Sequence, residues 1–166
     1  MQGASSVGEH PSVTGEGSHD IRVLGRFVVL AGGEEIAPSR FVGRLSKRLL
    51  RILAVHAGEH LSKDLLVDAL WPERAPSDPV ANLEVLVARV RKGLGIPELI
   101  LTGEGGYALV DDPRCRVDAI DVMRGAERGR GHAAAGRTRQ ALAEYLAAAD
   151  RWGGEPLPED AYEEWA

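Results

Sequence analysis

The chain has 166 residues, of which 44% are hydrophobic and 27% are charged, and its formal net charge is −5. This length holds one domain of ordinary size, or one small domain and part of a second. The acidic balance argues against a protein that coats nucleic acid through its overall field. Since the sequence has no run of about 18 apolar residues, we expect no membrane span.

The first 20 residues differ in composition from the rest. They contain three acidic residues, no Lys or Arg and no apolar segment, so they lack the parts of a signal peptide. We expect residues 1–20 to be a disordered tail. Residues 21–112 carry twelve basic and twelve acidic residues, so nucleic-acid contacts would come from local patches such as 40–51, which has no acid. The single cysteine fits a reducing cytoplasm, where we expect the protein.

Short elements come first in the chain. Segments rich in β-branched residues at 21–24 and 27–30 predict a strand hairpin, and 35–37 is expected to add a third strand. Apolar residues at helical spacing predict a helix over 45–57. A short extended link at His60-Leu61 leads to a second helix over 63–71, capped by Ser62 and stopped by Pro72.

The segment 78–95 predicts a third helix. Asp78 or Ser77 is the expected cap, Pro79 suits the first turn, and Gly95 suits the end. The apolar positions are Val80, Leu83, Leu86 or Val87, Val90 and Leu94. A basic last turn is what a helix in the DNA major groove needs. It is equally typical of an ordinary amphipathic helix with cations near its C-terminal dipole.

Two further parts follow. Segments 99–101 and 107–110 flank a Gly-rich tip and predict a hairpin, so the order of strands, three helices and hairpin indicates an α+β winged helix-turn-helix. After a break at 111–113, helices are expected over 117–131 and 137–152, with small residues that allow close packing, like one unit of a TPR-like all-α repeat. The predicted division is a tail (1–20), a winged helix (21–112) and a helical segment (113–166).

The sequence gives little support for a phosphate-binding, metal-binding or catalytic site. The GEGGY segment lacks a phosphate-loop pattern and precedes a strand. His56 and His60 have metal-like spacing, but Gly58 lies between them and no third ligand is evident. Cys115 has no histidine nearby and is expected to be a small residue in a linker. We therefore predict no catalytic residues, no metal, no cofactor and no enzymatic activity.

These features together resemble the Streptomyces antibiotic regulatory protein family of transcriptional activators, over residues 21–166. Segments 21–29 and 45–76 are similar to the opening strand and first two helices of an OmpR/PhoB-type winged helix, and 82–95 is similar to the recognition helix. Residues 117–166 resemble the start of a bacterial transcriptional activation domain. Three short elements carry the likeness: Leu70, Trp71 and Pro76; Thr102, Gly106 and Tyr107; Trp152, Gly154, Pro156 and Leu157.

The resemblance implies a cytoplasmic bacterial regulator that docks its third helix in the major groove of promoter DNA, typically at direct repeats. The implied DNA-binding residues are Asn82, Glu84, Val85, Ala88, Arg89, Arg91, Lys92, Arg48, Thr102 and Glu104. The loop before that helix would contact RNA polymerase through Trp71, Pro72, Glu73, Arg74 and Asp78. The helical segment would contact polymerase or self-associate, and because the family pattern continues for several helices, we expect a fragment of a longer fold.

Several positions depart from the family. Relatives often present Arg, His or Gln where this sequence has Glu84, Leu86 and Ala88, and Arg where the wing tip has Glu104. We expect Arg91 to be a backbone clamp. Fewer phosphate contacts predict low non-specific affinity and a shallow salt dependence. The alternative is a protein-interaction module whose winged helix has lost strong DNA binding.

Overall fold

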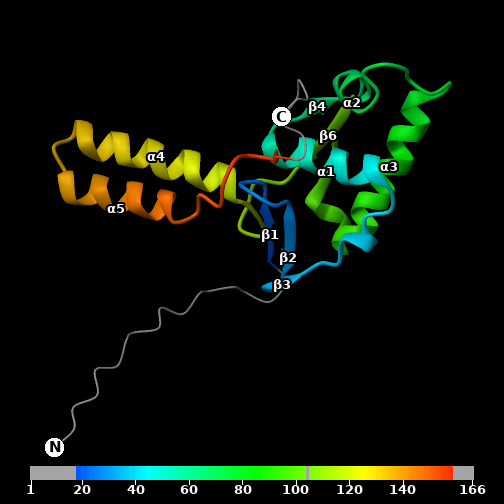
Figure 1. Ribbon diagram of the computed structural model, residues 1–166. Helices are drawn as coiled ribbons and strands as arrows, with labels where there is room; N and C mark the ends of the chain where they lie inside the picture. The colour runs from blue at the N-terminus through cyan, green and yellow to red at the C-terminus, as the bar shows by residue number, and fades with distance from the viewer. Residues whose placement is uncertain (1–17, 104, 159–166) are drawn as a thin grey trace, which may run out of the picture.

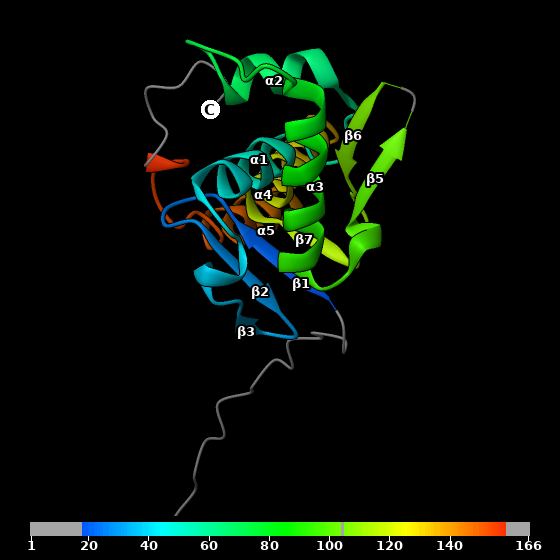
Figure 2. The same ribbon diagram turned by 90° about the vertical axis from the view of Figure 1, so that its right-hand side faces the viewer.

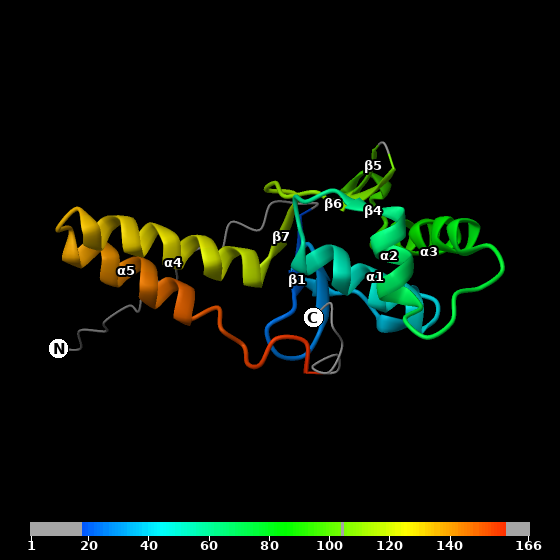
Figure 3. The ribbon, with the colours of Figure 1, turned by 90° about the horizontal axis from the view of Figure 1, so that it is seen from above.

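The computed structural model describes residues 18–103 and 105–158. A sheet from the N-terminal segment, a three-helix unit with a wing, and a long helical hairpin follow one another (Figure 1). The hairpin projects away from the other two parts, as the view from above also shows (Figure 3). The predicted winged helix followed by a helical segment is confirmed.

The first sheet begins earlier than the sequence predicted. Its strands β1 (His19–Arg22) and β2 (Val28–Ala31) are antiparallel, and β3 (Glu34–Glu35) pairs with β2. His19 is buried, and its Nε2 lies 2.9 Å from the Leu94 carbonyl oxygen. Residues 19 and 20 therefore belong to the sheet and not to the tail. Residues 1–17 of the predicted tail lie outside the described residues.

Three helices form the centre of the molecule: α1 (Arg44–Val55), α2 (Lys63–Leu70) and α3 (Pro79–Leu94). Ser62 caps α2 as predicted, because its Oγ accepts the Leu65 backbone N–H at 3.2 Å. The core between the helices consists mainly of leucine side chains that are 2% exposed or less. They include Leu49, Leu50, Leu53, Leu66, Leu70, Leu83 and Leu94.

The wing is a three-stranded sheet of order β4-β6-β5, made of β4 (Leu61–Ser62), β6 (Gly106–Leu109) and β5 (Ile100–Gly103). The predicted extended link at His60-Leu61 supplies β4. Gly106 is required at its position because an added Cβ would lie 1.9 Å from the Leu61 carbonyl oxygen. Short 3₁₀ turns, η1 (Pro38–Arg40) and η2 (Pro97–Leu99), precede α1 and β5.

The helical hairpin consists of α4 (Asp118–Ala134) and α5 (Thr138–Ala149). Small residues allow the two helices to pack closely, as predicted, and the closest approaches involve two glycines of α4 in addition to the predicted Ala148. A Cβ on Gly125 would lie 3.1 Å from the Ala148 Cβ, and one on Gly129 would lie 2.6 Å from the Tyr145 ring. Glycine weakens a helix interior, but at these two positions its lack of a side chain leaves room for α5 to pack closely. Leu142 and Leu146 remain 57% exposed.

One strand was not predicted from the sequence. β7 (Cys115–Val117) pairs in parallel with β1, so the expectation that Cys115 is a linker residue is wrong. The buried carboxylate of Asp118 then accepts the backbone N–H groups of Val23 at 2.9 Å and Leu24 at 3.1 Å. Leu157 is buried, and its N–H donates to the Val23 carbonyl oxygen at 2.8 Å. Segments beyond residue 112 are therefore fastened to the first sheet.

Candidate nucleic-acid interface

Helix α3 is fixed at both ends by the residues that the sequence indicated. Asp78 Oδ1 accepts the Ala81 N–H at 2.9 Å, and Pro79 occupies the first turn. Gly95 has a left-handed backbone (φ 80°), and its N–H donates to the Arg91 carbonyl oxygen at 3.0 Å. The helix has 16 residues and spans roughly 24 Å. It lies along one face of the molecule beside β5 and β6 (Figure 2).

The burial of α3 separates a core stripe from an exposed face. Leu83, Leu86, Val87, Val90 and Leu94 are buried, whereas Val80 is 38% exposed. Leu86 is one of the positions at which relatives often present Arg, His or Gln, but here its side chain is only 6% exposed and packs in the core, as one of the two alternatives for the apolar stripe indicated. The exposed face presents Asn82, Glu84, Val85, Ala88, Arg89 and Lys92.

Two polar residues on this face are held by neighbours. Lys63 of α2 donates to Glu84 Oε1 at 2.8 Å, and this hydrogen bond raises the pKa of Lys63. The Lys63 ammonium also lies 5.9 Å from the centre of the Tyr107 ring. Asn82 is exposed, and its Nδ2 donates to the Asp78 carbonyl oxygen at 2.7 Å. The negative charge of Glu84 is thus offset by a cation from the neighbouring helix.

The wing is tied to α3 by Arg91. Its Nη2 donates to the Ile100 carbonyl oxygen and to Thr102 Oγ1, both at 2.7 Å. This side chain is half-buried, so it fixes the distance between the helix and strand β5. The His60 ring packs against Gly103 at the end of β5, where an added Cβ would lie 2.4 Å from the ring. The role of Arg91 as a phosphate clamp remains a prediction.

The remaining site residues are spread over the neighbouring elements. Arg48 is half-buried on α1 and already interacts with other groups, and Thr102 is exposed on β5. Glu104 lies outside the described residues. The polymerase-contact loop joins α2 to α3, with Trp71 half-buried at its start and Asp78 capping α3 at its end. Pro72, Glu73 and Arg74 are exposed between them.

Cys115 and His56 are the remaining candidates for a reactive or metal-binding site among residues 18–103 and 105–158. Burial raises the pKa of the Cys115 thiol to about 12, so it stays protonated at neutral pH and is a poor nucleophile. His56 bonds to Glu59 at 3.1 Å, and no group of three or more possible metal ligands occurs among these residues. None of the described helices combines the length and apolar character that crossing a membrane requires.

Sequence comparisons agree with this geometry. Residues 43–109 match the family "Transcriptional regulatory protein, C terminal". The regulatory protein DnrI of Streptomyces peucetius is 27% identical over 147 residues, which cover 82% of this chain and 53% of DnrI. The regulatory protein AfsR of Streptomyces coelicolor is 30% identical over 138 residues, which cover 81% of this chain and 13% of AfsR. The chain is a relative of the Streptomyces antibiotic regulatory proteins.

A solved structure extends the likeness to most of the fold. Mycobacterium tuberculosis EmbR, in a complex with a low-affinity phosphopeptide, superposes with a TM-score of 0.74 at 27% identity. The match covers 89% of this chain and 39% of EmbR. Because it extends beyond the winged helix, the helical hairpin is part of the resemblance to these regulators. The chain spans about half the length of DnrI and smaller shares of the other two.

Proposed function

We propose that this chain is a DNA-binding transcription regulator that docks α3 in the major groove of promoter DNA and lays the β5–β6 wing on the adjacent backbone. One observation carries the proposal. Helix α3 is capped at both ends, buries one stripe of side chains and leaves the opposite face exposed. Arg91 ties this helix to the β5–β6 hairpin beside it. Such a helix is pre-organised for groove binding.

The exposed face suggests how sequence is recognised. Arg89 suits the O6 and N7 acceptors of guanine, and the methyl groups of Val85 suit the thymine methyl group. Asn82 retains a free acceptor oxygen. Lys92 at the end of the helix, and Arg91 if it exchanges its wing contacts, suit phosphates. With so few cations, affinity would depend on base contacts more than on charge.

The test is duplex binding by fluorescence anisotropy at low salt, on a promoter site selected from a random pool. Removing the guanidinium in Arg89→Ala should weaken binding to the selected site by about 1–3 kcal/mol. Arg139→Ala is the matched control, because Arg139 is exposed on α5, far along the chain from α3. Equal affinities for wild type, Arg89→Ala and Arg139→Ala would refute the docking of α3.

Partner contacts form a second part of the proposal. The exposed loop around Glu73 and Arg74 would touch RNA polymerase bound beside the site, and direct repeats would place two copies in line. The exposed Leu142 and Leu146 of α5 would serve self-association or polymerase contact through the helical segment. Arg74→Ala should lower transcription in a reconstituted assay while duplex affinity stays unchanged. Loss of both together would assign Arg74 to DNA binding instead.

A protein-interaction module is the second candidate, favoured by the Lys63–Glu84 ion pair. This pair places a carboxylate on the exposed face of α3 and occupies a cation that would otherwise suit phosphate. Glu84→Gln separates the two candidates. A regulator should bind its duplex more tightly when the carboxylate is removed, because repulsion from phosphates falls. For an interaction module, neither the wild type nor Glu84→Gln should select any duplex sequence.

A further inference from the structure

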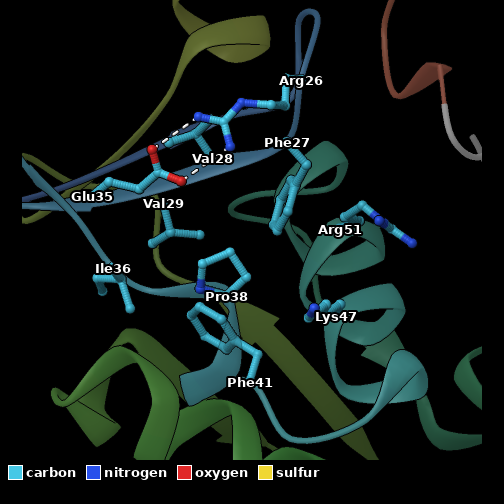
Figure 4. A pocket seen from close by; sticks show the side chains of 10 residues that line it. All are labelled: Arg26, Phe27, Val28, Val29, Glu35, Ile36, Pro38, Phe41, Lys47 and Arg51. Carbon is cyan, nitrogen blue, oxygen red and sulfur yellow. Dashed lines mark hydrogen bonds and ion pairs between the residues drawn. The ribbon is translucent and has the colours of Figure 1, made fainter.

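A small cavity lies between the first sheet and α1. Its volume is about 150 Å³. The walls are largely apolar: Val29 comes from β2, Ile36, Pro38 and Phe41 come from the segment after β3, and Phe27 comes from the turn before β2 (Figure 4). An apolar cavity of about this size in another protein accommodates benzene, so one six-membered ring fits.

The charges around this cavity are not balanced. Glu35, its one acidic residue, is bound by Arg26 through two hydrogen bonds of 3.1 and 2.9 Å. Two more cations, Lys47 and Arg51, line the α1 side. Arg51 lies over Phe27, 5.6 Å from the ring centre, and helps to hold that ring against the cavity. The lining therefore has three basic side chains and one acidic one, and both Arg26 and Arg51 already interact with other groups.

Lys47 is the cation placed to meet a ligand. It is half-buried on α1 and sits across the cavity from Val29 and Ile36 (Figure 4). It forms no hydrogen bond or ion pair with the residues that the structure describes. An ammonium group without a bonding partner beside an apolar cavity favours a ligand that has one anionic group and an apolar body.

We propose that this cavity binds a small monocarboxylate with a ring or branched apolar body, the carboxylate on Lys47 and the body between Phe27 and Phe41. The same site bears on α3, because Phe41 packs against Gly93. A Cβ on Gly93 would lie 2.5 Å from the Phe41 ring. A ligand that touches Phe41 therefore acts on a side chain that is in direct contact with the last turn of α3.

The first test measures binding without DNA. Sodium benzoate is titrated into the ¹⁵N-labelled chain and followed by amide shifts, with benzamide as the neutral probe of equal size. We expect benzoate to shift the amides of Val29, Phe41 and Gly93, and to bind about tenfold more tightly than benzamide. Equal binding of the two probes, or shifts confined to other surfaces, would overturn the proposal.

Variants then test the charge. Lys47→Met removes the ammonium but keeps the apolar stem, and should weaken benzoate binding about tenfold. Arg44→Met, an exposed cation one turn earlier on α1, is the matched control and should leave binding unchanged. Lys47→Glu should reverse the preference from benzoate to benzylamine. A similar loss in Lys47→Met and Arg44→Met, or no reversal in Lys47→Glu, would contradict the assigned carboxylate position.

The link to α3 rests on the proposed function, and its test is separate. Duplex affinity is measured with and without saturating benzoate, for the wild type and Lys47→Met. We expect benzoate to change the affinity of the wild type at least threefold and that of Lys47→Met much less. An unchanged wild-type affinity would refute the coupling. If the wild type binds no duplex at all, the proposed function fails while the binding titration still decides the ligand site.

Discussion

Arg91 is the residue at which two mechanisms make opposite predictions. If it ties the wing to α3, Arg91→Ala removes two hydrogen bonds from a charged donor, to the Ile100 carbonyl oxygen and to Thr102 Oγ1. Hydrogen bonds of this kind contribute about 1.5–3 kcal/mol to stability. Thr102→Val removes only one acceptor and should cost about 1 kcal/mol. Because both variants break the same bond, their effects should not add, and the coupling should be about 1 kcal/mol.

Urea unfolding of the two single variants and the double variant, followed by circular dichroism, gives this coupling energy without DNA. A coupling near zero would refute the tie between helix and wing. Duplex binding supplies the other half of the comparison. If Arg91 is instead a phosphate clamp, Arg91→Ala should lower the slope of log K against log salt by about 0.9. We expect the slope to stay within error, because the guanidinium is occupied by the wing.

Three further predictions concern the frame that holds the site. Asp118→Asn places an amide donor against the backbone N–H of Val23 or of Leu24, and should lower the free energy of unfolding in urea by about 2 kcal/mol. An unchanged urea midpoint would contradict the stabilising role of the Asp118 carboxylate. Gly106→Ala should prevent β4 from pairing with β6, so the Leu61 amide should lose its protection from hydrogen exchange. Protection of this amide equal to that in the wild type would disprove the prediction. The raised pKa of Cys115 means that only the unfolded chain ionises this thiol above its usual pKa of about 8.5, so stability should fall as pH rises from there toward 12, and the fall should be smaller in Cys115→Ala. An equal fall in both proteins would rule out that origin.

Local signals predicted α3 well. Asp78, Pro79 and Gly95 each act within one turn of the chain, and the helix begins and ends where they indicate. Burial was harder to predict from spacing alone, since Leu86 and Val87 are neighbours on the helix and the sequence offered them as alternatives. Both are buried, because α1 and α2 cover a wider stripe than one row of side chains. This width removes Leu86 from the exposed face.

Long-range pairing was the main feature that the sequence could not predict. The three residues of β7 follow a Pro-containing break and are too few to give a clear alternation, and their partner β1 lies almost 100 residues earlier. The same holds for the Asp118 cap on the turn after β1. The cavity beside Lys47 is also assembled from the sheet, the segment after it and α1, so no single stretch of sequence contains it. Arg91 and Thr102 were each predicted to contact DNA, whereas in the structure they also contact each other across the gap between α3 and β5.

The central claim, that α3 binds duplex DNA through a few cations and specific base contacts, is tested most directly by a salt series. Binding to a selected promoter duplex and to random duplex should be measured between 50 and 200 mM salt. With Arg89 on a base edge and Lys92 as the main phosphate contact, we predict a slope of log K against log salt of about −1 to −2. The selected site should also bind at least about 10³-fold more tightly than random duplex. Equal affinity for both duplexes, or no binding at 50 mM salt, would contradict the account.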